Sequence, residues 1–415
     1  MKLKLYLSIA ILIGYYLFLA VTCNNVRKEY YDSGEIKSIT TYRWNTKNGK
    51  FVSFHRNGLV DEEGQYKYDS RDGIWKTWDN EGRLLEEKSY KADRRDGAWK
   101  KWNIYGYLQK EEYYKDGELD GVWRSWNEKN VLETEGFYKL GKKEGLWKTR
   151  YENGELKEEG LYKDGKRDGL WKEWSSDGVL LAEGNYKENR KEGVWKMWPA
   201  VFKWIREINY KDDFFDGVWK SWYKNGQLKS EGIYKSGKPD GVWKEWYDNG
   251  QLQSVGNFKD GLLITYESWY ENGRKKSEEN YNGLSNRKSR NGKKCLDDVD
   301  SFYASPLSCY FDFIRDGEYQ EWFENGKMKE LGNYKSGKQD GLWKSWYKNG
   351  KLQEMGTYKD GYKDGVWKTW CENGKLEWTQ QYDAEEEKWL KICLDNNPSP
   401  LNNCRQSYRA KKNER

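Results

Sequence analysis

Eight tryptophans lie 24 residues apart along this chain without a single slip. A fixed period in the range of roughly 20–50 residues is typical of a repeat array, in which one supersecondary unit is copied and stacked. The period therefore predicts an extended surface, although 415 residues would otherwise suggest two or three globular domains. The periodic positions are Trp75, Trp99, Trp123, Trp147, Trp171, Trp195, Trp219 and Trp243, and Tyr319, Trp343 and Trp367 resume the same period further on.

One repeat, residues 217–240, reads GVWKSWYKNGQLKSEGIYKSGKPD. Asn225-Gly226 separates two runs rich in aromatic and aliphatic residues, and Asn-Gly favours a type I′ hairpin turn, which needs positive φ at both central residues. The repeat is then a strand, a tight turn, a second strand and a looser turn at 236–241. We expect an all-β fold: an elongated single-layer antiparallel sheet of stacked 24-residue β-hairpins.

Centring the tight turn on Asn225-Gly226 predicts the register, in which Tyr223 faces Leu228 and Trp219 faces Gly232. One face then carries Trp219, Tyr223, Leu228, Gly232 and Tyr234, and the other carries Val218, Lys220, Trp222, Glu231 and Ile233. The same register opposes a base and an acid in Lys76–Glu87, Lys100–Glu111, Arg124–Glu135, Lys148–Glu159, Lys172–Glu183, Lys196–Glu207 and Lys220–Glu231. It also sets Trp over Gly in several units, where an indole compensates for the side chain that glycine lacks.

The two faces have different expected roles. The Trp219 face should be the core, because a one-layer sheet has little else to bury and aromatics bury large areas. The opposite face alternates tryptophan with Lys–Glu pairs, so it is half solvated and its indoles are candidates for contact with a partner. These candidates are Trp78, Trp102, Trp126, Trp174, Trp198, Trp222, Trp246, Trp322, Trp346 and Trp370.

Residues 1–22 have the composition of an export signal, with two lysines before an apolar stretch from Leu5 to Val21. Cys23 follows, and the arrangement resembles a bacterial lipoprotein signal, in which the cysteine becomes lipidated. Ala20-Val21-Thr22 departs from the usual pattern of leucine three positions before the cysteine and a small residue just before it. Lipidation, an uncleaved signal anchor and ordinary secretion all remain open.

The other cysteines fit an oxidising compartment. Cys295 and Cys309 lie in a non-repeat insertion and Cys393 and Cys404 in the tail, so we expect two small disulfide loops; Cys371 has no evident partner. A metal site is not favoured, because the cysteine spacing is not C-x₂-C and the chain has one histidine.

The expected organisation follows from where the period holds and where it breaks. It comprises a signal or anchor at 1–22, a repeat array at 23–283, an insertion at 284–316, further repeats at 317–383 and a C-terminal tail at 384–415. Two units depart from the pattern: the segment 199–202 replaces a tight turn, and the unit at 261–283 has Tyr266 at its first aromatic position.

The repeat core DGVWKSWYKNGQLKSEGIYKSGKPDG at 216–241 resembles the variant MORN repeat of bacteria, and the resemblance covers nearly all of 26–383. It implies antiparallel hairpins stacked into a long single-layer sheet, with binding or scaffolding roles, in some members at membranes, and no catalysis. Many such proteins carry antitoxin labels. An exported, membrane-tethered chain, however, is in the wrong compartment to neutralise a cytosolic toxin.

Nothing in the sequence marks an enzyme. His55 is the one histidine and is expected to be a surface strand residue; the carboxylates recur with the period, and no P-loop or dinucleotide motif occurs. We expect no cofactor and no metal. The charge of +6 arises from 74 basic and 68 acidic residues closely interleaved, which does not favour nucleic acid.

The expected function is a non-catalytic scaffold at the bacterial cell envelope that binds protein partners along its sheet. One alternative is attachment to membrane lipid headgroups or glycans through the Trp222 face and its lysines. Another is an antitoxin or immunity role, which rests on family labels alone. The sequence names no partner.

Overall fold

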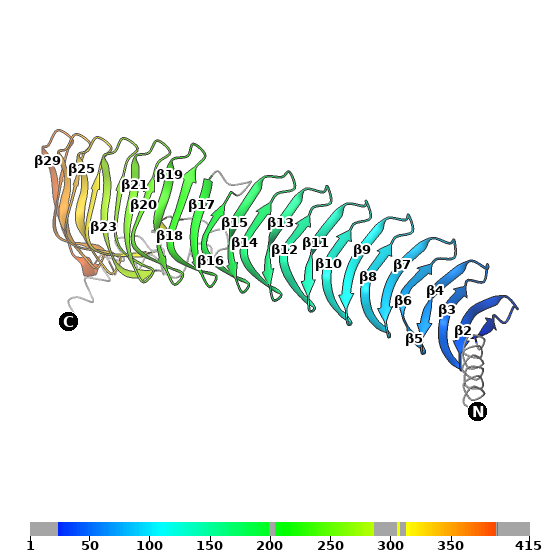
Figure 1. Ribbon diagram of the computed structural model, residues 1–415. Coiled ribbons are helices and arrows are strands. Elements are labelled where there is room, and N and C mark those ends of the chain that lie inside the picture. Colours follow the sequence, from blue (N-terminus) through cyan, green and yellow to red (C-terminus); the bar gives the residue numbers. More distant parts are fainter. Residues whose placement is uncertain (1–23, 199–203, 286–304, 308–312, 387, 389–415) are drawn as a thin grey trace, which may run out of the picture. The chain divides into compact units, whose positions relative to one another are not determined.

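In the computed structural model, the described residues are 24–198, 204–285, 305–307, 313–386 and 388, and nearly all of them lie in twenty-nine β-strands and their turns (Figure 1). The chain divides into two compact units, residues 1–190 (unit 1) and 191–415 (unit 2). Each unit is described by itself below. The all-β fold expected from the sequence is confirmed.

Unit 1 contains fifteen strands of mostly eight or nine residues. They are β1 (Asn24–Tyr30), β2 (Ile36–Arg43), β3 (Thr46–Phe54), β4 (Val60–Lys67), β5 (Ser70–Arg71), β6 (Gly73–Trp78), β7 (Leu84–Lys91), β8 (Arg94–Trp102), β9 (Leu108–Lys115), β10 (Glu118–Trp126), β11 (Leu132–Lys139), β12 (Lys142–Arg150), β13 (Leu156–Lys163), β14 (Lys166–Trp174) and β15 (Leu180–Lys187).

Unit 2 has the same strand lengths, and its first strand begins at the boundary between the units. Its strands are β16 (Arg190–Met197), β17 (Trp204–Lys211), β18 (Phe214–Tyr223), β19 (Leu228–Lys235), β20 (Lys238–Trp246), β21 (Leu252–Lys259), β22 (Leu262–Trp269), β23 (Lys275–Ser285), β24 (Phe313–Trp322), β25 (Met328–Lys335), β26 (Lys338–Trp346), β27 (Leu352–Lys359), β28 (Tyr362–Trp370) and β29 (Leu376–Tyr382).

Within each unit the strands form a meander, since each one pairs antiparallel with the next in sequence (Figure 1). In unit 1, β4 pairs with both β5 and β6, so these two form one interrupted strand. In unit 2, β23 pairs with β24, with Glu279 opposite Tyr319. The ladder of antiparallel pairs therefore continues from β23 to β24.

The register agrees with the sequence along most of each hairpin and differs next to the turn. Trp219 pairs with Gly232, as expected, and Lys220 with Glu231. Trp222, rather than Tyr223, pairs with Leu228, because a β-bulge shifts the register between Ser221 and Trp222. The expected Tyr223–Leu228 pair, and with it the placement of Leu228 on the Trp219 face, is therefore wrong.

The turn at Asn225-Gly226 explains that bulge. The Tyr223 amide donates to the Gln227 carbonyl at 2.8 Å, the Gly226 amide donates to the Tyr223 carbonyl at 3.0 Å, and Gly226 has a φ of 85°. Asn225 is not among the residues with positive φ. This is a three-residue loop, in which a type I turn is followed by a left-handed glycine and a bulge, and not the expected type I′ turn.

The type I′ turns lie at the opposite end of the hairpins. Ser236 and Gly237 have φ of 49° and 78°, and Lys235 pairs with Lys238 across them. Residues other than glycine also adopt this conformation, as Leu140 does at φ 49°. The Gly141 amide beside it donates to the Leu119 carbonyl of the preceding repeat at 2.8 Å. Contact with the neighbouring repeat thus helps to hold a backbone conformation that leucine alone disfavours.

One face of the sheet is the core, as expected. We call the side that carries Trp219, Ser221, Gly232 and Tyr234, with their equivalents, the core face, and the side of Val218 the outer face. The core indoles are at most 3% exposed at eight positions: Trp75, Trp147, Trp171, Trp195, Trp219, Trp243, Trp343 and Trp367. Trp99 and Trp123 are half-buried.

Six core glycines lie under an indole, and in each case that indole comes from the following strand. A Cβ on Gly232 would lie 2.1 Å from Cδ2 of Trp243, which belongs to β20, although the hairpin partner of Gly232 is Trp219. We call the glycine position of one strand, together with the core aromatic residue of the next strand that lies beside it, a rung. The same arrangement recurs at Gly64–Trp75, Gly136–Trp147, Gly160–Trp171, Gly332–Trp343 and Gly356–Trp367.

At these rungs the indole nitrogen also donates a hydrogen bond to the backbone. Trp243 Nε1 donates to the Ile233 carbonyl, one residue beyond the glycine, at 3.1 Å. The corresponding bonds measure 3.0–3.2 Å at Trp75, Trp147, Trp171, Trp343 and Trp367. These bonds link consecutive hairpins, and Trp99, which lies opposite Lys88 rather than a glycine, makes the same bond to the Ser89 carbonyl at 3.0 Å.

In unit 2 the rung at Gly256 has no tryptophan, and its glycine is covered by leucine side chains instead. Tyr266 holds the aromatic position, and a Cβ on Gly256 would lie 2.3 Å from Leu307 and 3.0 Å from Leu263. Leu307, which belongs to the segment between β23 and β24, is 1% exposed there. Leu307 therefore covers Gly256 in the way that an indole covers the glycine in the rungs named above.

Candidate functional site

The outer face displays a row of aliphatic side chains that sequence reasoning did not select. Each member directly precedes a core aromatic and points away from it. Val218, for example, is 43% exposed beside a core indole that is 1% exposed. We call this set the aliphatic row, and its exposed members are Ile74, Leu146, Leu170, Val194, Val218, Val242, Leu342 and Val366, at 41–53%.

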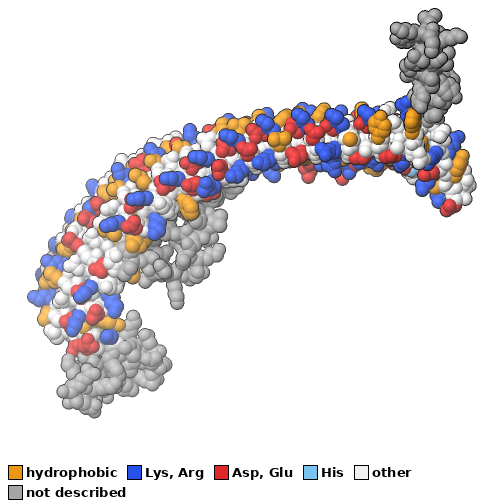
Figure 2. All heavy atoms as spheres, turned by 60° about the horizontal axis from the view of Figure 1, so that its bottom comes forward, with side chains coloured by type: hydrophobic (Ala, Val, Ile, Leu, Met, Phe, Trp, Pro, Cys, Tyr) orange, Lys and Arg blue, Asp and Glu red, His pale blue; other side chains and the backbone are white. Residues whose placement is uncertain are grey.

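Some outer-face pairs in the aliphatic row are apolar on both strands. Leu146 pairs with Leu161, which is 41% exposed, and Val218 pairs with Ile233, which is 49% exposed. A signal for this row exists in the sequence: the repeated Gly-aliphatic-Trp motif retains an apolar residue where strand alternation predicts a solvated one. Figure 2 shows that hydrophobic, basic and acidic side chains are intermingled over the visible surface.

Beside the aliphatic row lies a row of cross-strand ion pairs, at the positions expected from the sequence. The amine–carboxylate distances are 3.4 Å for Lys76–Glu87, 3.6 Å for Lys148–Glu159, 3.8 Å for Lys172–Glu183 and 3.7 Å for Lys220–Glu231. These side chains are about a quarter to two-fifths exposed, so each pair contributes less than about 1 kcal/mol. Their main effect is to neutralise the middle of the outer face.

The third row consists of the tryptophans expected to form the contact face. Trp78, Trp102, Trp126, Trp174, Trp198, Trp222, Trp246, Trp322, Trp346 and Trp370 are all half-buried. Their backbone is fixed by the preceding repeat: Tyr151 Oη donates to the Trp174 carbonyl and Tyr223 Oη to the Trp246 carbonyl, both at 2.8 Å. The indoles are thus held in place, but they are less exposed than the aliphatic row.

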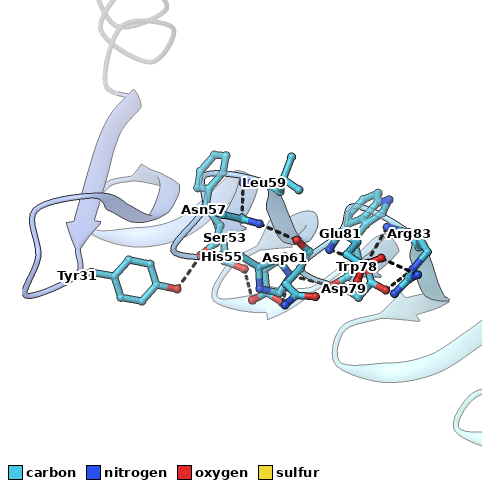
Figure 3. Close-up of polar contacts among 12 residues, drawn as sticks. Tyr31, Ser53, His55, Asn57, Leu59, Asp61, Trp78, Asp79, Glu81 and Arg83 are labelled. Atoms are coloured by element: carbon cyan, nitrogen blue, oxygen red, sulfur yellow. Dashed lines mark hydrogen bonds and ion pairs between the residues drawn. The ribbon is translucent and has the colours of Figure 1, made fainter. Parts of the chain in front are cut away.

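His55 occupies one of these tyrosine positions (Figure 3). Its Nε2 lies 3.0 Å from the Trp78 carbonyl and 3.6 Å from a carboxylate oxygen of Asp61. Ser53 donates its hydroxyl to Asp61 at 3.1 Å rather than to the imidazole. His55 is therefore half-buried and links two repeats, which is more than the surface role expected from the sequence. The three side chains lack the Ser–His contact of a nucleophile–base pair.

The core face has its own charged groups, which lie over the rings. Arg71 and Arg167 guanidinium carbons lie 4.5 and 4.2 Å from the ring centroids of the core indoles four residues on, and Lys143 and Lys363 amines lie 4.1 and 3.9 Å from theirs. Such cation–π contacts stabilise by roughly 0.5–1 kcal/mol at exposed sites and more when desolvated. These basic side chains cover the core rings on the side away from the sheet backbone.

A buried ion pair joins β23 to β24. Glu279, which stands at the glycine position of its rung, is 4% exposed and accepts from Arg315 Nε at 2.6 Å and from Tyr281 Oη at 2.8 Å. Burial, with the Glu279 charge, raises the pKa of the Tyr281 hydroxyl. Burial opposes the charged form of Arg315, but Glu279 outweighs it and raises the pKa of the guanidinium. The contact between Glu279 and Arg315 therefore joins the two strands.

A half-buried carboxylate, that of Glu245, lies on β20. Burial raises the pKa of Glu245, against hydrogen bonds from Ser305 and Ser254 and the charge of Lys229. Ser254 Oγ donates to it at 3.0 Å. Ser305 is itself 8% exposed and precedes Leu307 by two residues. This carboxylate therefore helps to dock the described part of the segment between β23 and β24 onto the core face.

Several expectations fall on residues that the structure does not describe. Cys23 lies outside the described residues, as do Cys295, Cys309, Cys393 and Cys404, so lipidation and both disulfides remain predictions. Cys371 is a free thiol. Among the described residues no group of three or more His, Cys, Asp or Glu side chains is arranged to hold a metal ion, and no helix there is both long enough and apolar enough to span a bilayer.

Comparison with known proteins identifies the repeats. Nine segments match the MORN repeat variant: 24–43, 71–92, 143–164, 167–188, 215–236, 239–260, 262–282, 315–336 and 339–360. These nine segments of the chain are thus variant MORN repeats, the repeat type that the resemblance had implied. No curated protein matches the chain.

Among solved structures, the chain is similar to the one titled "Crystal Structure of TcdB2-TccC3 without hypervariable C-terminal region". That likeness has 10% sequence identity and a TM-score of 0.13, and it covers 87% of this chain and 23% of the other. The chain thus spans less than a quarter of that structure's length, and the TM-score is too low to support an argument about this protein.

Proposed function

We propose that this MORN-repeat protein is a non-catalytic scaffold that binds a protein partner along its outer face. The aliphatic row carries the proposal. Its exposed members recur in consecutive repeats within each unit, at Leu146 and Leu170 in unit 1 and at Val194, Val218 and Val242 in unit 2. Adjacent exposed apolar side chains mark interaction sites, whereas apolar residues scattered singly on a surface are unremarkable in a monomer. Half-buried tryptophans beside the row add the residue type most often found at energetic centres of interfaces.

The repeat geometry indicates what such a partner could present. Two strands per repeat place equivalent side chains about 9–10 Å apart along the sheet. A helix rises about 10.5 Å in seven residues, so a partner helix with an apolar residue at every seventh position can follow the row over several repeats. The neutralised Lys–Glu pairs beside the row keep the surface from imposing a strong charge preference on that helix.

The proposal includes export to the bacterial cell envelope, supported by the composition of residues 1–22 and by Cys23 at their end. If Cys23 is lipidated, the protein should partition into detergent and incorporate labelled fatty acid, and Cys23→Ala should abolish both. Membrane retention of Cys23→Ala with residues 1–22 still attached would identify a signal anchor. A soluble, unprocessed chain in the cytosol would contradict export.

The binding claim is tested with a pair of variants that add the same charge. Leu146→Asp with Leu170→Asp places two carboxylates in the aliphatic row, and Ile104→Asp with Ser176→Asp places two at exposed turns. Proteins captured from the native envelope are compared by mass spectrometry for the wild type and both variants. A partner retained by the wild type and the turn variant, and lost by the row variant, supports the proposal. A partner retained equally by all three contradicts it.

A further inference from the structure

Lysine recurs in six consecutive type I′ turns at one edge of unit 1, and the type I′ turn before them, at 43–46, begins with Arg43 instead. Six turns, at 67–70, 91–94, 115–118, 139–142, 163–166 and 187–190, each begin with an exposed lysine. We call this set the lysine edge, and these first residues are Lys67, Lys91, Lys115, Lys139, Lys163 and Lys187.

Three of these turns place two positive charges directly opposite one another. Lys91 pairs with Arg94, Lys139 with Lys142 and Lys163 with Lys166 across the two strands that the turn joins. Like charges in directly opposed positions destabilise a hairpin. The outer face does the reverse, since its cross-strand lysines face glutamates. The lysine edge therefore carries an unfavourable charge arrangement that folding alone does not explain.

The edge charges are also poorly compensated by nearby acids. In the described part of the chain no carboxylate lies within 4.0 Å of the Lys91, Lys139 or Lys163 amine, whereas Lys166 has Glu188 at 3.4 Å. Asp93, which lies in the second of these turns, already accepts the Arg71 amide of the preceding repeat at 2.8 Å. Its carboxylate is directed at backbone rather than at the lysine beside it.

The two edges of unit 1 differ in charge sign. The six turns of the lysine edge contain ten basic and six acidic residues. The six turns of the opposite edge, at 55–59, 79–83, 103–107, 127–131, 151–155 and 175–179, contain three basic and six acidic residues. The near neutrality of the whole chain therefore conceals a segregated basic edge.

We infer that the lysine edge of unit 1 binds a linear, flexible polyanion of phosphate groups. Successive turns lie about 9–10 Å apart, close to the Debye length of about 8 Å at physiological ionic strength, so neighbouring turns act on the same stretch of polymer. Among the tips of the six turns, Tyr68 is the one ring on which a base could stack, and it is 72% exposed. Ala92, Leu140 and Asp164, at the three turns with opposed positive charges, offer none, so these three turns recognise charge without bases.

The edge also suits a polymer better than a flat anionic membrane. β-Sheets twist, so a row of turns along a sheet edge does not remain in one plane, and a flexible chain can follow it where a flat bilayer cannot. The inference goes beyond the proposed function, because it uses the turns rather than the aliphatic row. Its failure would leave protein binding by the outer face untouched.

The test measures binding of inorganic polyphosphate to the full chain at several salt concentrations. An edge variant combines Lys91→Ser, Lys139→Ser and Lys163→Ser; a matched control combines Lys76→Ser, Lys148→Ser and Lys172→Ser on the outer face. Circular dichroism confirms that both fold. We expect the wild type and control to bind alike and the edge variant to bind at least about tenfold more weakly. Its slope of log affinity against log salt should be smaller by about two.

Other outcomes overturn the inference. No polyphosphate binding by the wild type at 0.15 M salt, or equal binding by both variants, would show that the edge is not a polyanion site. Tighter binding of a single-stranded oligothymidylate would point to nucleic acid. Tighter binding of vesicles containing phosphatidylserine, with the same lysine dependence, would point to a lipid surface. Orthophosphate binding as tight as polyphosphate binding would exclude a polymer.

Discussion

A rung in unit 1 and a rung in unit 2 show what the core glycine contributes. At Gly160, the indole of Trp171 lies against the glycine and donates from Nε1 to the Leu161 carbonyl at 3.1 Å. At the equivalent position in unit 2 the chain has Ile208, and Trp219 is just as buried, yet its Nε1 has no hydrogen-bond partner among the described residues. A buried donor without a partner costs about 1–3 kcal/mol. The bond is therefore present beside Gly160 and absent beside the β-branched Ile208, although glycine is not required for it, since Trp99 opposite Lys88 also donates to a backbone carbonyl, that of Ser89, at 3.0 Å.

Acidic side chains replace glycine at two other rungs with a different result. Glu112 accepts from Trp123 Nε1 at 3.2 Å, so its carboxylate substitutes for the backbone carbonyl. Glu279 instead binds Arg315 in the buried pair between β23 and β24. At Glu112 the new side chain supplies the partner, and at Lys88 the Ser89 carbonyl still accepts from Trp99 Nε1 at 3.0 Å, whereas Trp219 beside Ile208 has no partner among the described residues.

The largest expected effect is the loss of a regular core indole. Trp171→Ala should cost about 3–5 kcal/mol of local stability through the cavity and lost transfer energy. Trp219→Ala should cost less, because no hydrogen bond of that indole is lost. Amide hydrogen exchange in the strands around each rung measures both. A greater loss at Trp219 than at Trp171 would contradict the comparison of the two rungs.

Removing one partner of the buried ion pair should be comparably severe. Glu279→Ala leaves Arg315 buried without its carboxylate, for an expected loss of about 3–5 kcal/mol in the β23–β24 region. Replacing both residues by methionine should recover much of that loss, since no charge is then stranded. Hydrogen exchange in β23 and β24 is the readout. Equal losses in the single and double variants would show that the charge pair is not the cause.

Adding a methyl group beneath an indole tests the rung itself. A Cβ at Gly160 would lie 2.2 Å from Trp171 Cδ2, so Gly160→Ala should cost about 1–3 kcal/mol through displacement of the ring. Gln380 holds the glycine position in β29, where it is exposed and pairs with Trp367. Gln380→Ala should therefore change stability by less than about 0.5 kcal/mol. Similar effects at the two positions would mean that the indole does not rest on the glycine.

The smallest effect is expected on the outer face. Lys220→Ala removes the exposed pair with Glu231, which lies at 3.7 Å, and should cost under about 1 kcal/mol. The loss of stability in Lys220→Ala should be of the same order as that in Lys172→Ala in unit 1. A cost equal to that of Trp219→Ala would mean that the assignment of the two faces is wrong.

The sequence sufficed for the fold class, the Trp–Gly and Lys–Glu pairing and the choice of core face, because these depend on a period repeated many times. It was wrong about the turns. Asn225-Gly226 favours a type I′ turn on local preference, whereas the structure has a type I turn with a bulge there and the type I′ turn at Ser236-Gly237. Stacking against neighbouring repeats, which no single hairpin shows, decides that choice.

The candidate site was predicted only in part for a similar reason. Alternation correctly placed Trp222 opposite the core face, but it could not show that Val218 would be more exposed than Trp222. Nor could pairing within one hairpin show that the indole over Gly232 belongs to Trp243. Both facts depend on contacts between hairpins, for which the linear sequence gives only the repeat length.

The assignment of a core face and an outer face is the central claim, and hydroxyl-radical footprinting of the intact chain tests it most directly. Trp171 and Trp174 lie three residues apart on β14 and have the same intrinsic reactivity, but Trp171 is 2% exposed and Trp174 is half-buried. The account predicts strong protection of Trp171 and clear oxidation of Trp174, with the same contrast between Trp243 and Trp246. Equal oxidation within these pairs, or protection of Trp174 and Trp246 instead, would contradict it.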